Sequence, residues 1–321
     1  MTTTQPLDKQ TESTRSGTGA GNENGTNGAG TGTKRRFPKI GPILPARLRP
    51  VNRPTMWIEI ALIGIAYYCY RVTQNAASTS GQSPFRRGRD ILSLERVLHI
   101  DIEHWLNHTV AKIDWLIVGM NYYYATLHFI VTIAVFVWVY LKFPDRYRAV
   151  RTVMFAMNGV ALIGFYLYAV APPRLLDPTR FIDTFCVHHT WGEQTCSGVA
   201  GLSGSMTNEF AAMPSLHIGW SVWCALAIAH LAKRKWVKVL GILYPVATFT
   251  VIISTANHYV LDAVGGLVTL AAAFLVQRIL QGRPVYRAAP SAEPVRMPQQ
   301  DAAEDDAAGA FTPARTVRLK D

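Results

Sequence analysis

The sequence contains few charged residues. Asp, Glu, Lys and Arg make up 17% of its 321 residues, whereas 49% are hydrophobic. A soluble domain usually carries about 25% charged residues, and low hydrophobicity is the mark of a disordered chain. The composition therefore excludes a disordered or fibrous protein and argues against a water-soluble globule.

Several signatures of cofactor and metal chemistry are also missing. The chain has four cysteines but no Cys-x-x-Cys pair, and it has no nucleotide-binding glycine loop. These patterns would have indicated a metal or redox site, or a bound nucleotide. We therefore expect no cofactor and no bound metal.

What the chain has instead is a series of long uncharged runs, at residues 115–141, 152–173, 210–232, 239–261 and 263–277. A helix needs about 20 mostly apolar residues to cross a bilayer. With a weaker apolar segment near residues 55–72, whose Glu59 and Arg71 are expected to reach the headgroups, these runs predict about six transmembrane helices. The other five lie near residues 122–141, 153–171, 213–232, 237–255 and 258–279. The expected fold class is an all-α, polytopic membrane protein.

The two ends of the chain differ from this apolar region. Residues 1–33 are rich in Gly, Thr, Asn and Ser and have no apolar periodicity, and residues from 284 onward are rich in Ala and Pro. Such composition is typical of disorder. We expect a disordered basic tail over residues 1–50, a six-helix membrane domain over 55–280, and a second disordered tail over 284–321.

Positive charge dominates the balance, with 32 Lys and Arg against 21 Asp and Glu. Such an excess could suit nucleic acid or an anionic membrane surface. The basic residues cluster before the first predicted helix and in alternate connections, at residues 34–53, 142–151, 233–238 and 278–287. Cytoplasmic loops are enriched in Lys and Arg. We therefore expect a multi-pass cell-membrane protein with both termini in the cytoplasm and no nucleic-acid partner.

Two long segments are expected on the opposite, outer face. In the first, apolar residues recur at helical spacing from Ile91 to Trp105, with Glu95 and Glu103 between them. This pattern predicts an amphipathic helix at the membrane interface. The second segment contains Cys186 and Cys196, on the side of the membrane where disulfides persist. The sequence leaves open whether they pair.

Three groups of polar residues lie at helix ends on this same outer face. The third predicted helix leaves the membrane there, the fourth enters and the fifth returns, so the topology alone brings the groups together. Along the chain the groups are Arg174, then Ser215 with His217, then His258 with Asp262.

These residue types suit phosphoryl transfer. His258 and Asp262 are four residues apart, which places them one above the other on a helix. The carboxylate can fix one imidazole tautomer and leave the other nitrogen as a nucleophile. His217 could protonate a leaving oxygen, while Arg174 and Ser215, beside a helix N-terminus, could bind phosphate. Together they indicate a phosphohistidine mechanism without metal.

Each feature also has an ordinary explanation when taken alone. A Pro-Ser pair commonly begins a helix, and an arginine after a helix often anchors in headgroups. Two further histidines, His128 and His230, are interpreted as helix-packing or interfacial residues. The functional interpretation depends on all three groups sharing one face.

At these residues the sequence resembles the type 2 phosphatidic acid phosphatase superfamily. Pro214-Ser215-Leu216-His217 and His258-x-x-x-Asp262 are similar to its second and third motifs. Pro172-Pro173-Arg174, Met213-Pro214-Ser215-Leu216-His217 and Asn257-His258-Tyr259 resemble more closely its inositol phosphorylceramide synthase branch.

The resemblance implies six helices with an active site at the outer membrane face. It also implies a role for each residue: His258 as nucleophile, Asp262 as the residue that orients it, and His217 as general acid. Arg174 would match the phosphate-binding arginine of the first motif.

The chain departs from the broad superfamily pattern at two places. Leu167 stands where that pattern has lysine, and Val251-Ile252 stands where it has Ser-Arg. These departures fit the synthase-like branch better than an ordinary lipid phosphatase. The missing positive charge could come from the same face, where the candidates are Arg86, Arg87 and Arg89.

The sequence therefore predicts an enzyme acting on a phosphorylated lipid, with water or a polyol such as inositol as acceptor. A polyprenyl-diphosphate phosphatase would use the same residues. Outside the enzyme class, a transporter or a non-catalytic scaffold remains an alternative. A transporter favours paired repeats and ionisable groups near the bilayer midplane, and the sequence shows no internal repeat.

Overall fold

The computed structural model describes residues 42, 43, 45, 54–76, 83–188, 190 and 210–288. All of these residues lie in one compact unit, Ile40–Asp321. Within them every regular element is a helix, and an isolated bridge joins Val170 to Ala211. The predicted tails, 1–50 and 284–321, fall almost entirely outside the described residues.

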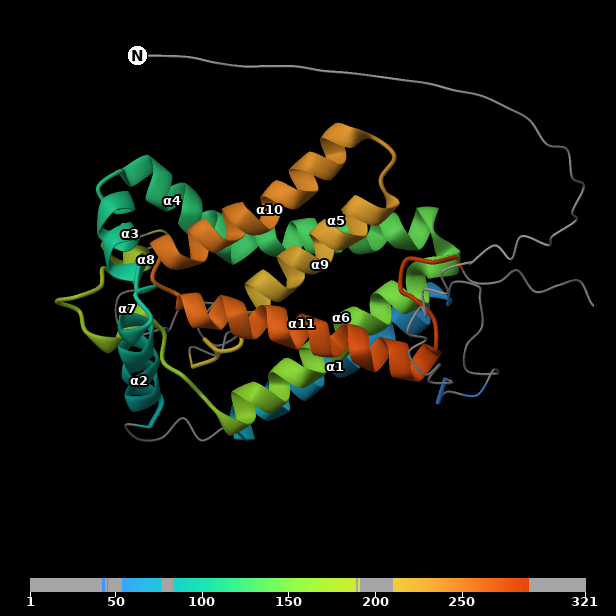
Figure 1. The fold of residues 1–321 in the computed structure, drawn as a ribbon, viewed down its shortest axis with the longest axis horizontal. Helices are drawn as coiled ribbons and strands as arrows, with labels where there is room; N and C mark the ends of the chain where they lie inside the picture. Colours follow the sequence, from blue (N-terminus) through green and yellow to red (C-terminus); the bar gives the residue numbers. More distant parts are fainter. Residues whose placement is uncertain are drawn as a thin grey trace, which may run out of the picture. The chain divides into compact units, whose positions relative to one another are not determined.

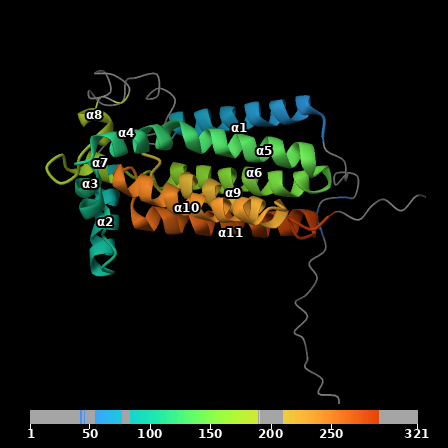
Figure 2. The ribbon, with the colours of Figure 1, turned by 90° about the horizontal axis from the view of Figure 1, so that it is seen from above.

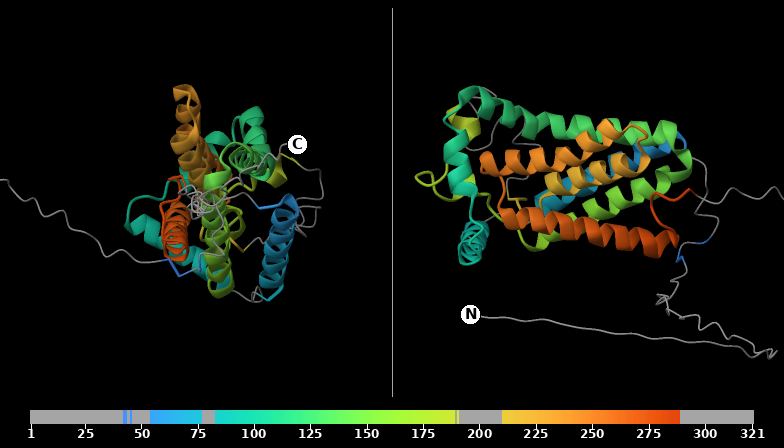
Figure 3. Two further views of the ribbon diagram at one scale, coloured as in Figure 1. Left: turned by 90° about the vertical axis from the view of Figure 1, so that its right-hand side faces the viewer. Right: turned by 45° about the horizontal axis from the view of Figure 1, so that its top comes forward.

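Long helices run side by side and make up most of the described chain (Figures 1 and 2). They are α1 (Met56–Ala76), α4 (Asp114–Tyr122) continuing through η2 (Tyr123–Leu127) into α5 (His128–Lys142), α6 (Pro144–Leu167), α9 (Leu216–Leu231), α10 (Lys235–Ser254) and α11 (Val260–Gln281). Helix α9 contacts α5, α6, α10 and α11, and Figure 3 shows it among them. The central helix of the bundle is therefore the one whose first turn carries His217.

Four helical segments are long and apolar enough to cross a membrane: Asp114–Lys142, Pro144–Leu167, Lys235–Ser254 and Val260–Gln281. They correspond to four of the six predicted crossings. Helix α9 has only 16 residues, or about 24 Å at 1.5 Å per residue, because its N-cap, Ser215, is extended. The crossings assigned to α1 and α9 remain predictions.

Several helix ends differ from those expected. The helix predicted at 153–171 starts earlier, with Pro144 in its first turn, and ends at Leu167. Proline fits the first turn because its missing N–H would be unpaired there. The helix predicted at 258–279 begins at Val260, which leaves His258 in the turn before it.

Glu59 does not reach out to headgroups as the sequence suggested. It is buried on α1, where its carboxylate pairs with Arg151 of α6 and accepts a hydrogen bond from the Tyr147 hydroxyl at 2.7 Å. A buried carboxylate needs such partners because desolvation is costly. Glu59, the charged residue within the first apolar segment, thus links α1 to α6.

The segment predicted to form one amphipathic helix forms two, α2 (Ser83–Val97) and α3 (Glu103–Val110). His99 has a positive φ of 58° in the turn between them, a conformation that ends a helix. Leu98 and Trp105 are exposed, whereas Glu95 and Glu103 are fully buried. The two glutamates therefore point toward the protein.

The helix ends are sorted into two groups. Helices α5, α9 and α11 end where α6 and α10 begin, at the end of the bundle that carries the basic connections (Figure 1). Helices α2 and α3, with the short helices α7 (Pro173–Leu176) and α8 (Thr184–Val187), lie at the other end. Cys186 there is disulfide-bonded, and Cys196 lies outside the described residues.

Candidate active site

The three groups of polar residues predicted to converge do so at the end of the bundle opposite the basic connections. His258 lies in the turn between α10 and α11, His217 lies in the first turn of α9, and Arg174 lies on α7. Helix α6 ends beside them because residues 168–172 leave the helix, and Val170 bridges to Ala211.

The surroundings of His258 fix which of its ring nitrogens carries hydrogen. His258 is buried, and its Nδ1 lies 2.9 Å from the Ala212 carbonyl oxygen and 3.3 Å from Asp262 Oδ2. Both oxygens can only accept, so Nδ1 is the donor in the neutral ring. This assignment leaves the lone pair on Nε2, which is the nitrogen that could act as nucleophile.

His217 lies directly opposite that lone pair. Its Nδ1 is 3.4 Å from His258 Nε2, and the two ring centroids are 5.4 Å apart. At this separation both nitrogens can reach the same phosphoryl group. The arrangement suits a nucleophile paired with an acid.

Asp262 reaches His258 in a way that the sequence did not predict. The two are not stacked on one helix, because His258 precedes α11 and Asp262 is its third residue. Asp262 Oδ2 also accepts a hydrogen bond from the Tyr259 backbone N–H at 2.9 Å. The carboxylate therefore caps the helix and holds His258 with the same oxygen.

Arg174 is fixed beside His258 through two side chains. Its Nε donates to Asn257 Oδ1 at 2.9 Å, and its Nη1 donates to Asp183 Oδ2 at 3.1 Å. Its backbone N–H donates to the Ala256 carbonyl at 2.9 Å. A guanidinium held in this way is aimed before substrate binds, which favours phosphate recognition.

Ser215 contributes through its backbone. Its hydroxyl is fully buried and has no hydrogen-bond partner among the described residues. Its N–H donates to the Asp262 carbonyl at 3.0 Å, and its carbonyl would lie 2.4 Å from a Cβ placed on Gly266. The close approach joins the start of α9 to α11, and the predicted contact of the hydroxyl with phosphate stays untested.

The three arginines proposed to supply extra positive charge all lie on α2. Arg87 donates from Nη1 to the Ala169 carbonyl at 3.2 Å, and its guanidinium lies 4.7 Å from the centre of the Tyr168 ring. Arg86 and Arg89 are exposed. Arg87 is thus tied to the segment that follows α6, while the other two face outward.

The structure adds residues that sequence reasoning missed. Tyr124 stacks on His217 with ring centroids 4.2 Å apart and ring planes 18° apart. The centroid of the His128 ring lies 4.5 Å from that of His217. His128 also stacks on Trp220. It is a packing residue, as predicted, but it packs against the site. Asn257 belongs to the Asn257-His258-Tyr259 motif and could have been recognised from the sequence, whereas Asp183 belongs to no motif.

A turn of π-helix places these rings. Tyr124 lies within η2 and His128 follows it directly. Such wide turns are rare and often occur at functional sites, because they redirect the side chains around them. The long helix from Asp114 to Lys142 is therefore reshaped at the level of His217.

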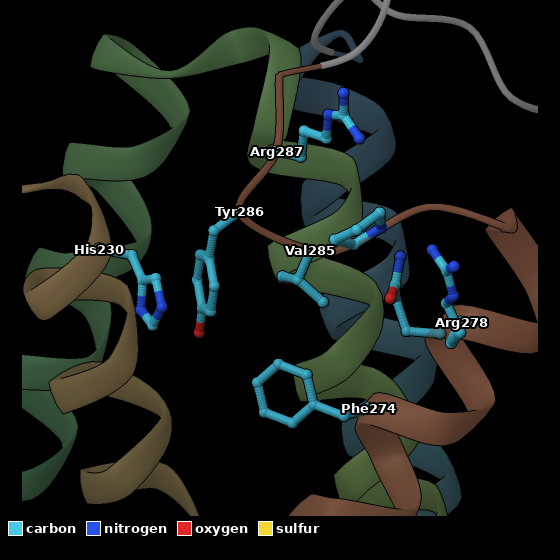
Figure 4. Close-up of a pocket in the computed structure, with 8 residues that line it drawn as sticks. His230, Phe274, Arg278, Val285, Tyr286 and Arg287 are labelled. Carbon is cyan, nitrogen blue, oxygen red and sulfur yellow. The ribbon is translucent and has the colours of Figure 1, made fainter. Parts of the chain in front are cut away.

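The pocket shown in Figure 4 lies elsewhere. It has a volume of about 490 Å³ and is lined by residues from the ends of α9 and α11 and the segment after them. His230 stacks on Tyr286 there at 4.3 Å. This is the basic end of the bundle, so the pocket is separate from the histidine pair.

Among the residues that the structure describes, no three His, Cys, Asp or Glu side chains gather closely enough to hold a metal ion. The geometry is that of a helical membrane protein with a paired-histidine site. A family model described as the PAP2 superfamily matches residues 89–276, which is more than half of the chain. The chain belongs to this superfamily, and it is a membrane enzyme of the phosphatase or phosphotransferase type.

The matched range contains every one of the predicted site residues except Arg86 and Arg87. The resemblance seen in the sequence is confirmed at the level of the superfamily, while the inositol phosphorylceramide synthase branch stays a prediction. No curated protein and no solved structure matches the chain.

Proposed function

We propose that this protein is a lipid phosphatase or phosphotransferase that works through a phosphohistidine on His258. The observation that carries the proposal is the close contact between the two histidines, whose ring nitrogens meet. The protonated Nδ1 of His258 leaves its Nε2 as a nucleophile 3.4 Å from His217 Nδ1. No other pair of histidines in the described chain combines this contact with a carboxylate partner.

The first chemical step forms the covalent intermediate. His258 Nε2 attacks the phosphorus of a phosphorylated lipid, and the bond from phosphorus to the lipid oxygen breaks. His217, entering the step protonated, donates its proton to that oxygen. Asp262 supports the positive charge that grows on the attacking ring.

The second step releases the phosphoryl group. An acceptor hydroxyl gives its proton to His217, which is now neutral, and its oxygen attacks phosphorus as the N–P bond breaks. Water as acceptor gives a phosphatase, and a polyol such as inositol gives a phosphotransferase. Arg174 binds the nonbridging oxygens in both steps, where charge develops.

The phosphotransferase outcome is favoured by what the site lacks. Leu167 is exposed at the end of α6, at the position where the broad superfamily pattern has a lysine. The resemblance of the Arg174, His217 and His258 segments to the synthase-like branch points the same way. A polyprenyl-diphosphate phosphatase is the second candidate, because it would use the same residues on another lipid.

We further propose that both termini lie in the cytoplasm and that the site faces the opposite side. The basic connections at residues 142–151 and 233–238 support this orientation, because cytoplasmic loops are enriched in Lys and Arg. Helices α1 and α9 would then complete six crossings.

The decisive experiment measures turnover of labelled phospholipids by the purified protein, with and without inositol. His258→Ala and His217→Ala should each lose at least about 10³-fold in kcat, as expected for removing a nucleophile or its acid. The wild-type protein should form a phosphohistidine, detected as acid-labile label on the protein, and His258→Ala should not.

His230→Ala is the matched control, because this histidine lies at the far end of the bundle. It should keep wild-type turnover. Full activity of His258→Ala in a preparation free of contaminating phosphatase would end the proposal. Solute flux in proteoliposomes without hydrolysis would favour a transporter, and inactivity in both assays a scaffold.

A further inference from the structure

Two buried glutamates lie against the start of α11, at the end of the bundle where α2 and α3 sit (Figure 1). Glu95 of α2 accepts a hydrogen bond from the Leu261 backbone N–H at 2.7 Å. Glu103 of α3 accepts one from the Val260 N–H at 2.9 Å. Both side chains are fully buried, although glutamate is almost never fully buried unless it is paired.

Three successive backbone donors are occupied by three carboxylates. Asp262 takes the N–H of residue 259, and the two glutamates take the next two. These donors belong to the first turn of a helix, where backbone N–H groups have no partner within the helix. The turn follows His258 directly, so its position sets the position of the nucleophile.

We propose that Glu95 and Glu103 are positioning residues that share one proton and together fix the backbone carrying His258. The proposal rests on the function proposed above for that histidine. It assigns α2 and α3 a role in the reaction without contact with substrate.

The burial of the two carboxyl groups favours a proton between them. The second carboxyl oxygens of the two glutamates are buried, and neither has another hydrogen-bond partner among the described residues. Each glutamate also affects the pKa of the other, so the two side chains are neighbours. Two bare carboxylates in such a place would repel each other and lose their hydration. A single proton converts the pair into a carboxylic acid donating to a carboxylate.

The surrounding charges favour the same protonation state. The negative charge of Asp262 on α11 also raises the pKa of Glu95, and that of Asp101, in the turn before α3, raises the pKa of Glu103. Tyr259 is a neutral neighbour of the pair. Burial, with the charge of Glu103 second, raises the pKa of Glu95 to about 9. Burial also raises the pKa of Glu103.

The arrangement also decides where phosphate cannot bind. The N-terminus of a long helix attracts anions, but that of α11 is filled by the protein's own carboxylates. The phosphoryl group is therefore left to Arg174 and the start of α9.

The test compares amide and alanine variants of the full-length protein. In Glu95→Gln the amide oxygen can accept the Leu261 N–H and the amide N–H can donate to Glu103, so the variant imitates the protonated acid. It should keep kcat near the wild-type value at pH 7. Glu95→Ala removes both bonds and should lose about 10²-fold in kcat, as a small displacement of a catalytic group does, with KM little changed.

The pH profile separates this role from a merely structural one. Wild-type kcat should fall above about pH 9, where Glu95 loses the shared proton, and Glu95→Gln should lack that fall. Asp90→Asn, an exposed carboxylate on the same helix, is the matched control and should follow the wild type. Wild-type kcat in Glu95→Ala, or equal losses in the alanine and glutamine variants, would overturn the proposal.

A second measurement does not depend on activity. The unfolded chain releases the proton at the ordinary glutamate pKa of 4.5, whereas the folded pair keeps it to about pH 9. The folded state is therefore stabilised at low pH, and this stabilisation is lost as pH rises across that interval. The thermal midpoint of wild type in detergent should fall with pH more steeply than that of Glu95→Gln.

The two proposals can fail separately. If no phospholipid is turned over but the stability slopes differ, the proposed function fails and the shared proton stands. If wild type and Glu95→Gln have the same slope, the shared proton is refuted whether or not the enzyme is active.

Discussion

His217 is held between two aromatic rings, and this determines how freely it can move. Tyr124 stacks on one side and His128 lies on the other, at centroid distances of 4.2 and 4.5 Å. Stacked rings of this kind stabilise each other by about 0.5–1.5 kcal/mol beyond the area that they bury. The ring is thus kept facing His258 before any substrate arrives.

Arg174 gives the sharpest prediction at the scale of single residues. Arg174→Lys keeps the positive charge but cannot contact Asn257 and Asp183 with two nitrogens of one planar group. We expect kcat/KM to fall by about 10²-fold, as loss of one aimed donor does. The measurement is steady-state turnover of the best labelled phospholipid.

Arg234→Lys, in the connection between α9 and α10, is the matched control for this exchange. It should behave as wild type. Unchanged kcat/KM in Arg174→Lys would show that charge alone is sufficient and that the fixed geometry of the guanidinium is irrelevant.

At the scale of elements, the contact between α9 and α11 aligns the two histidines. The helices meet where Gly266 faces the Ser215 carbonyl, and a Cβ at that glycine would lie 2.4 Å from the oxygen. The oxygen is backbone, so it cannot rotate away. Glycine is needed here for close approach, since a larger residue would push the start of α9 from α11.

Gly266→Ala should therefore damage both stability and activity. Overpacking of this kind destabilises by about 1–3 kcal/mol, and the shift would separate His217 from His258. Gly159→Ala on α6 is the control, because nothing lies within 4 Å of its added Cβ. Thermal unfolding and kcat are measured together, and wild-type values for both in Gly266→Ala would contradict the role of this contact.

Helix α1 is joined to the bundle by a buried ion pair and a hydrogen bond. Glu59 pairs with Arg151 and accepts from Tyr147, both on α6. Removal of one member of a buried pair leaves the other uncompensated. An acid that weakens the apolar signal in the sequence is thus what fixes the first helix in the fold.

At the scale of the whole molecule, chemistry and charge lie at opposite ends of the bundle. The histidine pair lies beside α2, α3 and α7, whereas the basic connections and the pocket at His230 lie at the other end (Figures 1 and 4). If the basic end faces the cytoplasm, the site opens toward the outer leaflet.

Single-cysteine labelling tests this orientation. In a chain whose free thiols Cys69 and Cys224 are replaced by Ala, Arg234→Cys should react with a membrane-impermeant maleimide only after the cells are permeabilised. Thr179→Cys, in the exposed segment after α7, should react in intact cells, because cytoplasmic loops are the basic ones. The reverse pattern would invert the proposed topology.

The extent to which the sequence predicted the fold depends on the element. Long uncharged runs predicted four membrane helices well, because such runs reflect a solvent that tolerates no exposed backbone. The same reasoning missed where helices end. His258 was placed in a helix that begins two residues later, at Val260, because helix ends depend on caps such as Asp262 and Tyr259.

The periodicity of the sequence also did not predict which faces of α2 and α3 point toward the protein. Apolar residues from Ile91 to Trp105 follow a helical repeat, and an amphipathic helix would turn the glutamates between them, Glu95 and Glu103, toward water. They instead point inward because two backbone N–H groups of α11 offer hydrogen bonds there. Periodicity describes one helix, whereas these partners come from a distant part of the chain.

The sequence by itself determined the class of the protein and the residues that gather at its site. Apolar runs force membrane helices, and their alternating direction brings Arg174, His217 and His258 to one end. Only the tertiary structure decided the state of each group. The Ala212 carbonyl selects the His258 tautomer, and the Glu95–Glu103 pair holds the turn behind it. Such contacts join residues far apart in sequence, and no local pattern encodes them.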